Sequence, residues 1–224
     1  MSIMVKDFPE NEVENAEALS YVKSQVEAAK GKEFTHITIP DKMVYLDTPI
    51  VLNQNFKLNG EGPNSGLHIN YTTPGKNTHC VWVEPQENGR IDKFEISGIK
   101  FITNVAHHDG QGIGCVRVTS NEDQGVYNGH IYNNEFRVKK AAGAEAIKTK
   151  TYALNVGSQE EPYGNPYKVS NVIVETNSFV ECIGKNLQFT LASNCIGRYN
   201  RIVQPNTKTM GVDGPCLRLV GTYG

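Results

Sequence analysis

The sequence predicts an all-β fold, a right-handed single-stranded parallel β-helix with an N-terminal capping α-helix. Two observations predict it. Short strands that alternate apolar and polar residues fill the chain after residue 33, and no second helical pattern appears among them. Two kinds of segment then recur along these strands with the same residue types at the same places, as a solenoid of stacked coils requires.

An amphipathic pattern predicts the helix over residues 11 to 30. Its apolar residues recur at helical spacing: Leu19, Val22, Val26 and Ala29. Asn11 stands where an N-cap belongs, and Gly31 stands where a helix favours a C-terminal glycine. Because a single helix needs a surface to pack on, we expect this one to cover the first coil of the solenoid.

The chain is therefore expected to have two regions. Residues 1–33 are assigned to an N-terminal arm and the capping helix, and residues 34–224 to the parallel β-helix. The chain stops shortly after Val220, where the next asparagine turn would be due. We therefore expect the solenoid to be incomplete at its C-terminal end, or covered there by another chain.

The first recurring segment is six residues long and ends in a large apolar residue. Its copies occupy residues 96–101, 131–136, 174–179 and 197–202, and they end in Phe101, Phe136, Phe179 and Ile202. Their fourth place holds asparagine in three copies: Asn134, Asn177 and Asn200. Coils that stack about 4.8 Å apart would place these asparagines in a ladder that satisfies turn backbone groups. A sandwich or barrel gives no reason for this recurrence.

The second recurring segment is an apolar-polar-apolar triplet. Its predicted copies are Val116-Arg117-Val118, Ile147-Lys148-Thr149, Leu187-Gln188-Phe189 and Leu217-Arg218-Leu219. The middle residues should point outward in one column: Arg117, Lys148, Gln188 and Arg218. Two interpretations stay open. The column is either the ordinary polar surface of a strand or a groove for an extended anionic glycan, whose carboxylates suit arginine.

Two carboxylates on neighbouring coils are the candidate catalytic residues. Glu135 and Glu175 are expected on one face, together with Tyr132, Arg198 and Arg201 as substrate-binding residues. Long side chains there could approach the ~6.5–9.5 Å separation of an inverting glycosidase pair. A lyase would instead use a base beside an arginine that neutralises a carboxylate. An ordinary surface cluster of ion pairs is the alternative to both.

The entry to the solenoid resembles that of the pectin-lyase-like superfamily. The resemblance rests on residues 15–40, 47–52 and 56–62, which correspond to a capping helix, a strand with a proline turn, and an L-x-G-x-G turn. Within that superfamily the chain is most similar to bacteriophage tailspike and polysaccharide depolymerase proteins. The resemblance implies a homotrimer of a virion, assembled in the host cytoplasm, that binds and depolymerises a bacterial surface polysaccharide as a hydrolase or lyase. A non-catalytic glycan-binding adhesin, or a structural β-helix of a virion, remains the alternative.

Composition argues against several other classes. The net charge of −2 over 224 residues does not favour non-specific nucleic-acid binding. No stretch approaches the ~18 consecutive apolar residues of a membrane-spanning helix, and the first residues do not match a secretory signal. The five cysteines lack CxxC spacing and are expected to be buried thiols. No metal or other cofactor is expected.

Overall fold

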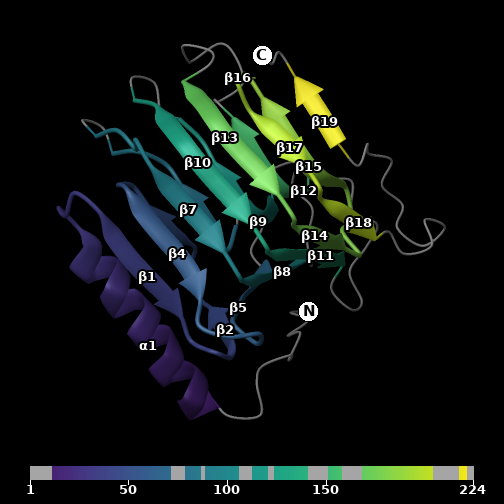
Figure 1. Cartoon of the computed structure of the whole chain (residues 1–224). Helices are drawn as coiled ribbons and strands as arrows, with labels where there is room; N and C mark the ends of the chain where they lie inside the picture. The colour runs from purple at the N-terminus through teal and green to yellow at the C-terminus, as the bar shows by residue number, and fades with distance from the viewer. Residues whose placement is uncertain are drawn as a thin grey trace.

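The chain winds into the predicted right-handed parallel β-helix. The structure, a computed structural model, describes residues 12–71, 79–86, 89–105, 113–120, 124–140, 151–157, 168–203 and 217–220. Within these residues, all strand pairs are parallel and belong to three sheets, which we call sheets A, B and C. Figure 1 shows the strands of sheet A side by side along the length of the molecule.

Each coil contributes a strand to sheet A, then to sheet B, then to sheet C. Sheet A contains β1 (Thr35–Ile39), β4 (Phe56–Gly60), β7 (Phe94–Ser97), β10 (Val126–Tyr132), β13 (Val169–Glu175), β16 (Ala192–Ser193) and β17 (Ile196–Arg198). Sheet B contains β2 (Met43–Leu46), β5 (Gly66–Tyr71), β8 (Lys100–Val105), β11 (Glu135–Lys140), β14 (Ser178–Val180) and β18 (Arg201–Val203). Sheet C contains β3 (Ile50–Leu52), β6 (Val81–Val83), β9 (Ile113–Val118), β12 (Thr151–Gly157), β15 (Lys185–Thr190) and β19 (Leu217–Val220).

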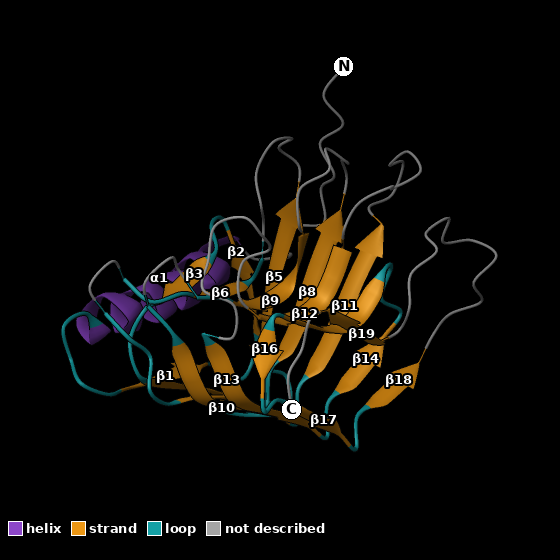
Figure 2. Cartoon of the chain, turned by 90° about the horizontal axis from the view of Figure 1, so that it is seen from above, coloured by secondary structure: helices purple, strands orange, loops and turns teal. Residues whose placement is uncertain are grey.

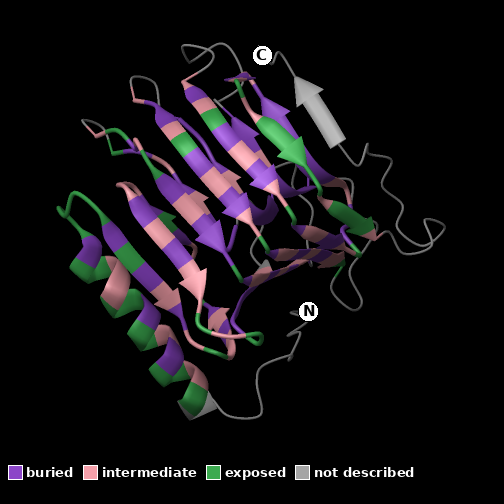
Figure 3. Ribbon diagram, in the orientation of Figure 1, coloured by how far each residue is buried: buried purple, intermediate pink, exposed green. Residues whose placement is uncertain are grey.

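Alternating side chains place one face of each strand in the core, and Figure 3 shows the resulting bands of buried residues. The predicted apolar column is confirmed. Phe101, Phe136 and Phe179 are fully buried and in register, with successive ring centroids 5.2 and 5.1 Å apart. Ile202 continues the column, paired with Phe179. The solenoid therefore has one continuous core rather than separate sheets of a sandwich.

The predicted asparagine ladder is confirmed at the turn between sheets A and B. The backbone and side-chain amides of Asn134 both donate to Oδ1 of Asn177, at 3.0 and 3.1 Å. Asn177 makes the same pair of bonds to Asn200, both at 3.0 Å. The residue before each asparagine has a left-handed backbone: Asn133, Thr176 and Tyr199. This conformation lets the chain turn between the two sheets within two residues.

Helix α1 (Glu12–Ala29) packs on the first coil, as predicted, and lies at one end of the strand stack (Figure 2). Its apolar face buries Val22 and Ala29, and Gly31 follows it with a φ of +75°. Asn11, the predicted N-cap, lies outside the described residues. In the described part of the chain, no helix is long and apolar enough to cross a membrane.

Two amide side chains of α1 take the place of a further strand. Gln25 accepts a hydrogen bond from the backbone N–H of Thr38 and donates one to its carbonyl, both at 2.9 Å. Asn15 does the same at Tyr45, with distances of 2.8 and 3.3 Å. These contacts satisfy backbone groups on the outer edges of β1 and β2, which would otherwise invite pairing with another chain.

The cysteines within the described residues carry no disulfide. Cys80, Cys115 and Cys182 are buried, as predicted, and Cys195 is partly buried. Burial raises the pKa of the Cys80 and Cys182 thiols to about 12, so both stay protonated at neutral pH. These thiols are therefore core side chains rather than nucleophiles.

Candidate functional site

The outer face of sheet C lies between the longest connections of the solenoid. The turns from sheet A to sheet B are short, such as the two residues between β10 and β11. The connections on either side of sheet C contain more residues, with residues 141–150 before β12 and 158–168 after it. Binding residues concentrate where variable connections flank a rigid scaffold. The outer face of sheet C is therefore the first place to look for a site.

One in-register column of outward residues runs along this face. We call it the sheet C column, and its members are Val51, Trp82, Arg117, Asn155, Gln188 and Arg218. Neighbouring members are separated by one strand spacing, about 4.8 Å. Three of the four residues predicted for this column are confirmed in it, although Arg218 is placed by its backbone register alone.

The predicted place of Lys148 in the column is wrong. The strand that pairs with both Arg117 and Gln188 is β12, and Asn155 occupies the shared register position. Lys148 itself lies outside the described residues. Connections before sheet C vary in length, so the sequence offers two triplets that fit the pattern of this strand. They are Ile147-Lys148-Thr149 and Leu154-Asn155-Val156. The second triplet supplies two apolar side chains to the core, Leu154 and Val156, whereas the first has a polar threonine in place of the valine. The column is consequently less basic than predicted.

Arg117 is the centre of an aromatic and charged cluster. Its guanidinium lies over the Trp82 ring, 5.1 Å from the centroid, which is within the range of a cation–π contact. The His79 ring lies 6.1 Å from that of Trp82. Burial lowers the pKa of His79 to about 3, and the charge of Arg117 adds to this shift, so the imidazole is neutral. Sequence reasoning missed His79 and Trp82, although Val81-Trp82-Val83 has the pattern of the column.

Glu84 adds a carboxyl group to the same cluster. It follows β6 directly and lies two residues after Trp82, so it projects from the same outer face. Burial raises the pKa of the Glu84 carboxyl, while the charge of Arg117 acts in the opposite direction. Titratable groups with shifted pKa values concentrate at functional sites. Glu84, His79 and Arg117 together make this end of the column the most chemically distinctive part of the described surface.

The column also carries buried hydrogen-bonding atoms without a protein partner among the described residues. They are Nε1 of Trp82, Oδ1 of Asn155, Oε1 of Gln188 and both ring nitrogens of His79. Gln188 is only 1% exposed although its strand position faces outward, and its amide nitrogen donates to Thr190. Leaving such an atom unsatisfied costs about 1–3 kcal/mol. Trp82, Arg117 and Asn155 are only half-buried, so their accessible parts can contact a polar ligand that runs along the column.

A second polar cluster lies on the outer face of sheet A. Glu175 accepts hydrogen bonds from His130 Nε2 at 2.9 Å and from Arg198 Nε at 2.7 Å. These bonds, that of Arg198 first, lower the pKa of the Glu175 carboxyl, so it is ionised at neutral pH. The ring of Tyr132 stacks on His130 with centroids 4.2 Å apart. The sequence predicted Glu175, Arg198 and Tyr132 as site residues. It did not predict His130, which lies one residue before the recurring segment 131–136.

The expectation that Glu135 and Glu175 share one face is wrong. Glu175 belongs to sheet A, whereas Glu135 and Arg201 belong to sheet B, beyond the asparagine turn. Glu135 accepts a hydrogen bond from Arg137 at 2.6 Å and lines a hollow of about 330 Å³ at the corner between the sheets. The separation of the two carboxylates was counted along the coil without allowing for the asparagine turn, which places Glu135 on sheet B. The structure therefore separates the predicted catalytic pair.

Searches beyond the geometry add no identification. Within the described residues, no group of three or more His, Cys, Asp or Glu side chains is placed to hold a metal ion. Comparison of the chain with protein-family models, with curated proteins and with solved structures found no match. The argument for function therefore depends on the chemistry of the sheet C column and of the sheet A cluster.

Proposed function

We propose that this chain binds an extended bacterial surface polysaccharide along the sheet C column, in the manner of tailspike-like β-helices of the pectin-lyase-like superfamily. One observation carries the proposal. The column presents the aromatic ring of Trp82, the guanidinium of Arg117 and the amide of Asn155 in register, and all three side chains are half-buried rather than covered. A polysaccharide repeats hydroxyl and carboxylate groups along its length, so it can meet a repeating column of donors and acceptors.

The chemistry of the individual residues supports a glycan over other extended ligands. Trp82 offers an aromatic face with a polar N–H, which can stack on a sugar ring. Arg117 can bind a carboxylate through two parallel hydrogen bonds. The half-buried amide of Asn155 can both donate and accept, as sugar hydroxyls require. The chain as a whole is slightly acidic, so a nucleic acid is a poor fit.

Cleavage of the bound polysaccharide is the second candidate function, favoured by the contact between His130 and Glu175. A carboxylate that holds an imidazole in place is a common arrangement for proton transfer. Glu175 is suited to the ionised role, and Arg198 beside it can neutralise an acidic group. A hydrolase or lyase would use this cluster, whereas a non-catalytic adhesin or structural β-helix would only bind. The same resemblance extends the proposal to a homotrimer carried on a virion.

A glycan panel scored for both binding and cleavage tests the proposal. Affinity for acidic polysaccharides should fall as salt rises, since surface charges are screened within about 8 Å at physiological ionic strength. Arg117→Gln should weaken binding about tenfold, the equivalent of one lost charge-assisted hydrogen bond. Lys93→Gln removes the same charge from an exposed position before β7 and should leave binding unchanged. Circular dichroism would confirm that both variants fold.

Four results separate the alternatives. Unchanged binding in Arg117→Gln would remove the sheet C column from the proposal. Oligosaccharide release with loss of viscosity would establish a depolymerase, and release that survives His130→Gln would place catalysis elsewhere. Light scattering that shows a stable monomer at micromolar concentration would contradict the homotrimer.

A further inference from the structure

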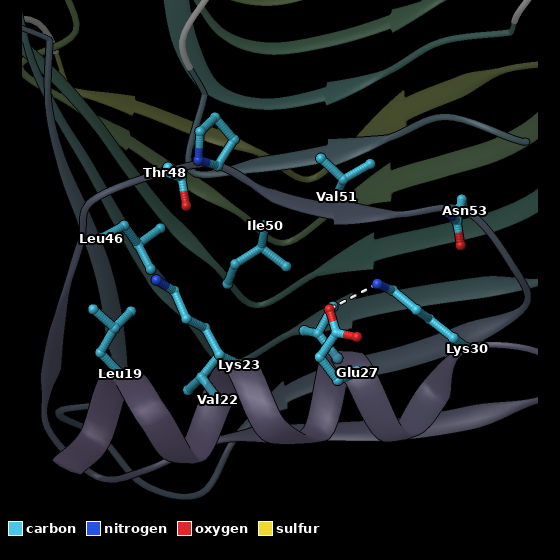
Figure 4. A pocket seen from close by; sticks show the side chains of 12 residues that line it. Leu19, Val22, Lys23, Glu27, Lys30, Leu46, Thr48, Ile50, Val51 and Asn53 are labelled. Atoms are coloured by element: carbon cyan, nitrogen blue, oxygen red, sulfur yellow. Dashed lines mark hydrogen bonds and ion pairs between the residues drawn. The ribbon is translucent and has the colours of Figure 1, made fainter. Parts of the chain in front are cut away.

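A groove separates the C-terminal half of α1 from the first coil. Its volume is about 430 Å³, within the range of small-molecule sites. Figure 4 shows Leu19 and Val22 on the helix side, with Leu46 and Ile50 on the strand side. Val51, at the lip, is 46% exposed, which is unusual for a valine in a strand. The floor of the groove is aliphatic, and because Val22, Leu46 and Ile50 are almost fully buried, the exposed apolar surface lies at the lip.

Polar groups line the edge of this groove. Lys23 forms an ion pair with Asp47 at 2.8 Å. Lys30 forms one with Glu27 at 2.7 Å, which Figure 4 shows as a dashed line. An ammonium group has three donors, and each of these pairs uses one. Asn53 adds an amide at the same edge. The groove therefore combines an aliphatic floor with donors at its edge, which suits an aliphatic group attached to a polar, oxygen-rich molecule.

The groove is continuous with the sheet C column. Val51 pairs in register with Trp82, so the strand at the lip of the groove lies one strand spacing, about 4.8 Å, from the strand that carries the aromatic ring. The backbone N–H of Glu84 donates to the carbonyl of Leu52, which joins the next outward position to the same strand. A ligand that follows the column toward the capping helix therefore reaches the groove without leaving the surface.

We propose that the groove between α1 and β3 binds an aliphatic group carried by a sugar, such as an acyl substituent of the polysaccharide. This inference rests on the proposed function, and it narrows the substrate class to glycans with apolar substituents. The sugar lies against Trp82, its aliphatic group lies among Leu19, Ile50 and Val51, and the lysines donate to its ester or ring oxygens. A second copy of the chain docked in the groove is the competing occupant.

Octyl β-D-glucopyranoside, used below its micelle-forming concentration, is the probe. Methyl β-D-glucopyranoside, which has the same sugar but no octyl group, is its control. The octyl compound should bind at least about tenfold more tightly in a calorimetric titration, because its methylene groups leave water. Val51→Asp should abolish this difference. Ile196→Asp places the same charge at a residue of equal exposure, 47%, on β17 and should preserve it. Thermal unfolding would confirm that both variants fold.

Each remaining outcome overturns the inference. Equal binding of the two glucosides, or octyl binding that Val51→Asp does not change, shows that the groove takes no aliphatic group. A dimer that Val51→Asp dissociates, without octyl glucoside binding, identifies a second copy as the occupant. Failure of the proposed function is detected by a separate experiment, because the effect of Arg117→Gln on polysaccharide binding is measured without the octyl probe.

Discussion

Asn134 and Asn177 each bond to the coil before and to the coil after their own. Oδ1 of Asn177 accepts two hydrogen bonds from Asn134, and its Nδ2 donates to Asn200 and to the carbonyl of Ile131. Asn177 is only 1% exposed, so water cannot replace these bonds. The side chain is therefore a structural crosslink between three coils, and its energetic weight exceeds that of an ordinary turn residue.

Asn177→Ala should lower the free energy of unfolding by about 3 kcal/mol or more, since several buried groups lose their partners at about 1–3 kcal/mol each. Ser170→Ala, on the outer side of β13, should cost less than about 0.5 kcal/mol. Urea denaturation monitored by circular dichroism measures both. Equal effects of the two substitutions would show that the ladder contributes little beyond its backbone geometry.

His79 links stability to pH. Its pKa is about 3 in the folded chain against an ordinary value of 6.5, so the unfolded chain binds a proton more readily between these values. Unfolding is then favoured as pH falls from 6.5 toward 3, and the contribution of His79 is fully present only above 6.5. His79→Leu should flatten the dependence of the unfolding free energy on pH across this interval. The measurement is the change in the urea midpoint between pH 7 and pH 4. A change as large in His79→Leu as in the parent protein would contradict this assignment.

At the scale of the strand, the sequence predicted the parts of the fold that have a fixed spacing. The turn from sheet A to sheet B is two residues long in several coils, so Asn134 and Phe136 recur in step with their neighbours and identify the coil. The connections before sheet C vary, and the register of Lys148 was lost there. Side-chain burial on an outer face was also beyond prediction, because Gln188 points outward and is nevertheless buried. The alternation of residues in a strand predicts which side chains point outward, but it does not predict which of them other parts of the chain bury.

Helix α1 shows how a helix can protect the edge of a sheet. Gln25→Ala should remove both hydrogen bonds to the backbone of Thr38 and reduce stability by about 1–3 kcal/mol. The exposed edge of β1 should also promote association between chains. Ser24→Ala, one residue earlier and exposed, is the matched control. Urea denaturation and size-exclusion chromatography measure the two effects, and identical behaviour of the variants would show that α1 protects the edge by packing alone.

At the scale of the whole molecule, each coil contacts mainly the coils on either side of it. Stability in such a solenoid is approximately a sum over neighbouring coils rather than a property of one central core. Among the described residues, the large apolar side chains that remain exposed lie on α1, the first coil and the last coil: Tyr21, Phe34, Val51, Ile196, Tyr199 and Ile202. The middle coils are covered on both sides, whereas the two end regions retain apolar surface.

The parallel stacking of coils has a mechanical consequence. A force that pulls the two ends of the chain apart loads only the outermost coil, because its strands can peel from the next coil without disturbing the rest. At the other end, Asn15 and Gln25 clamp the first coil to α1, so peeling there must first tear away a helix. Of the two ends of the described strand stack, the β19 side should therefore yield first under tension, one coil at a time, and the stack should lengthen in steps set by the number of residues in each coil.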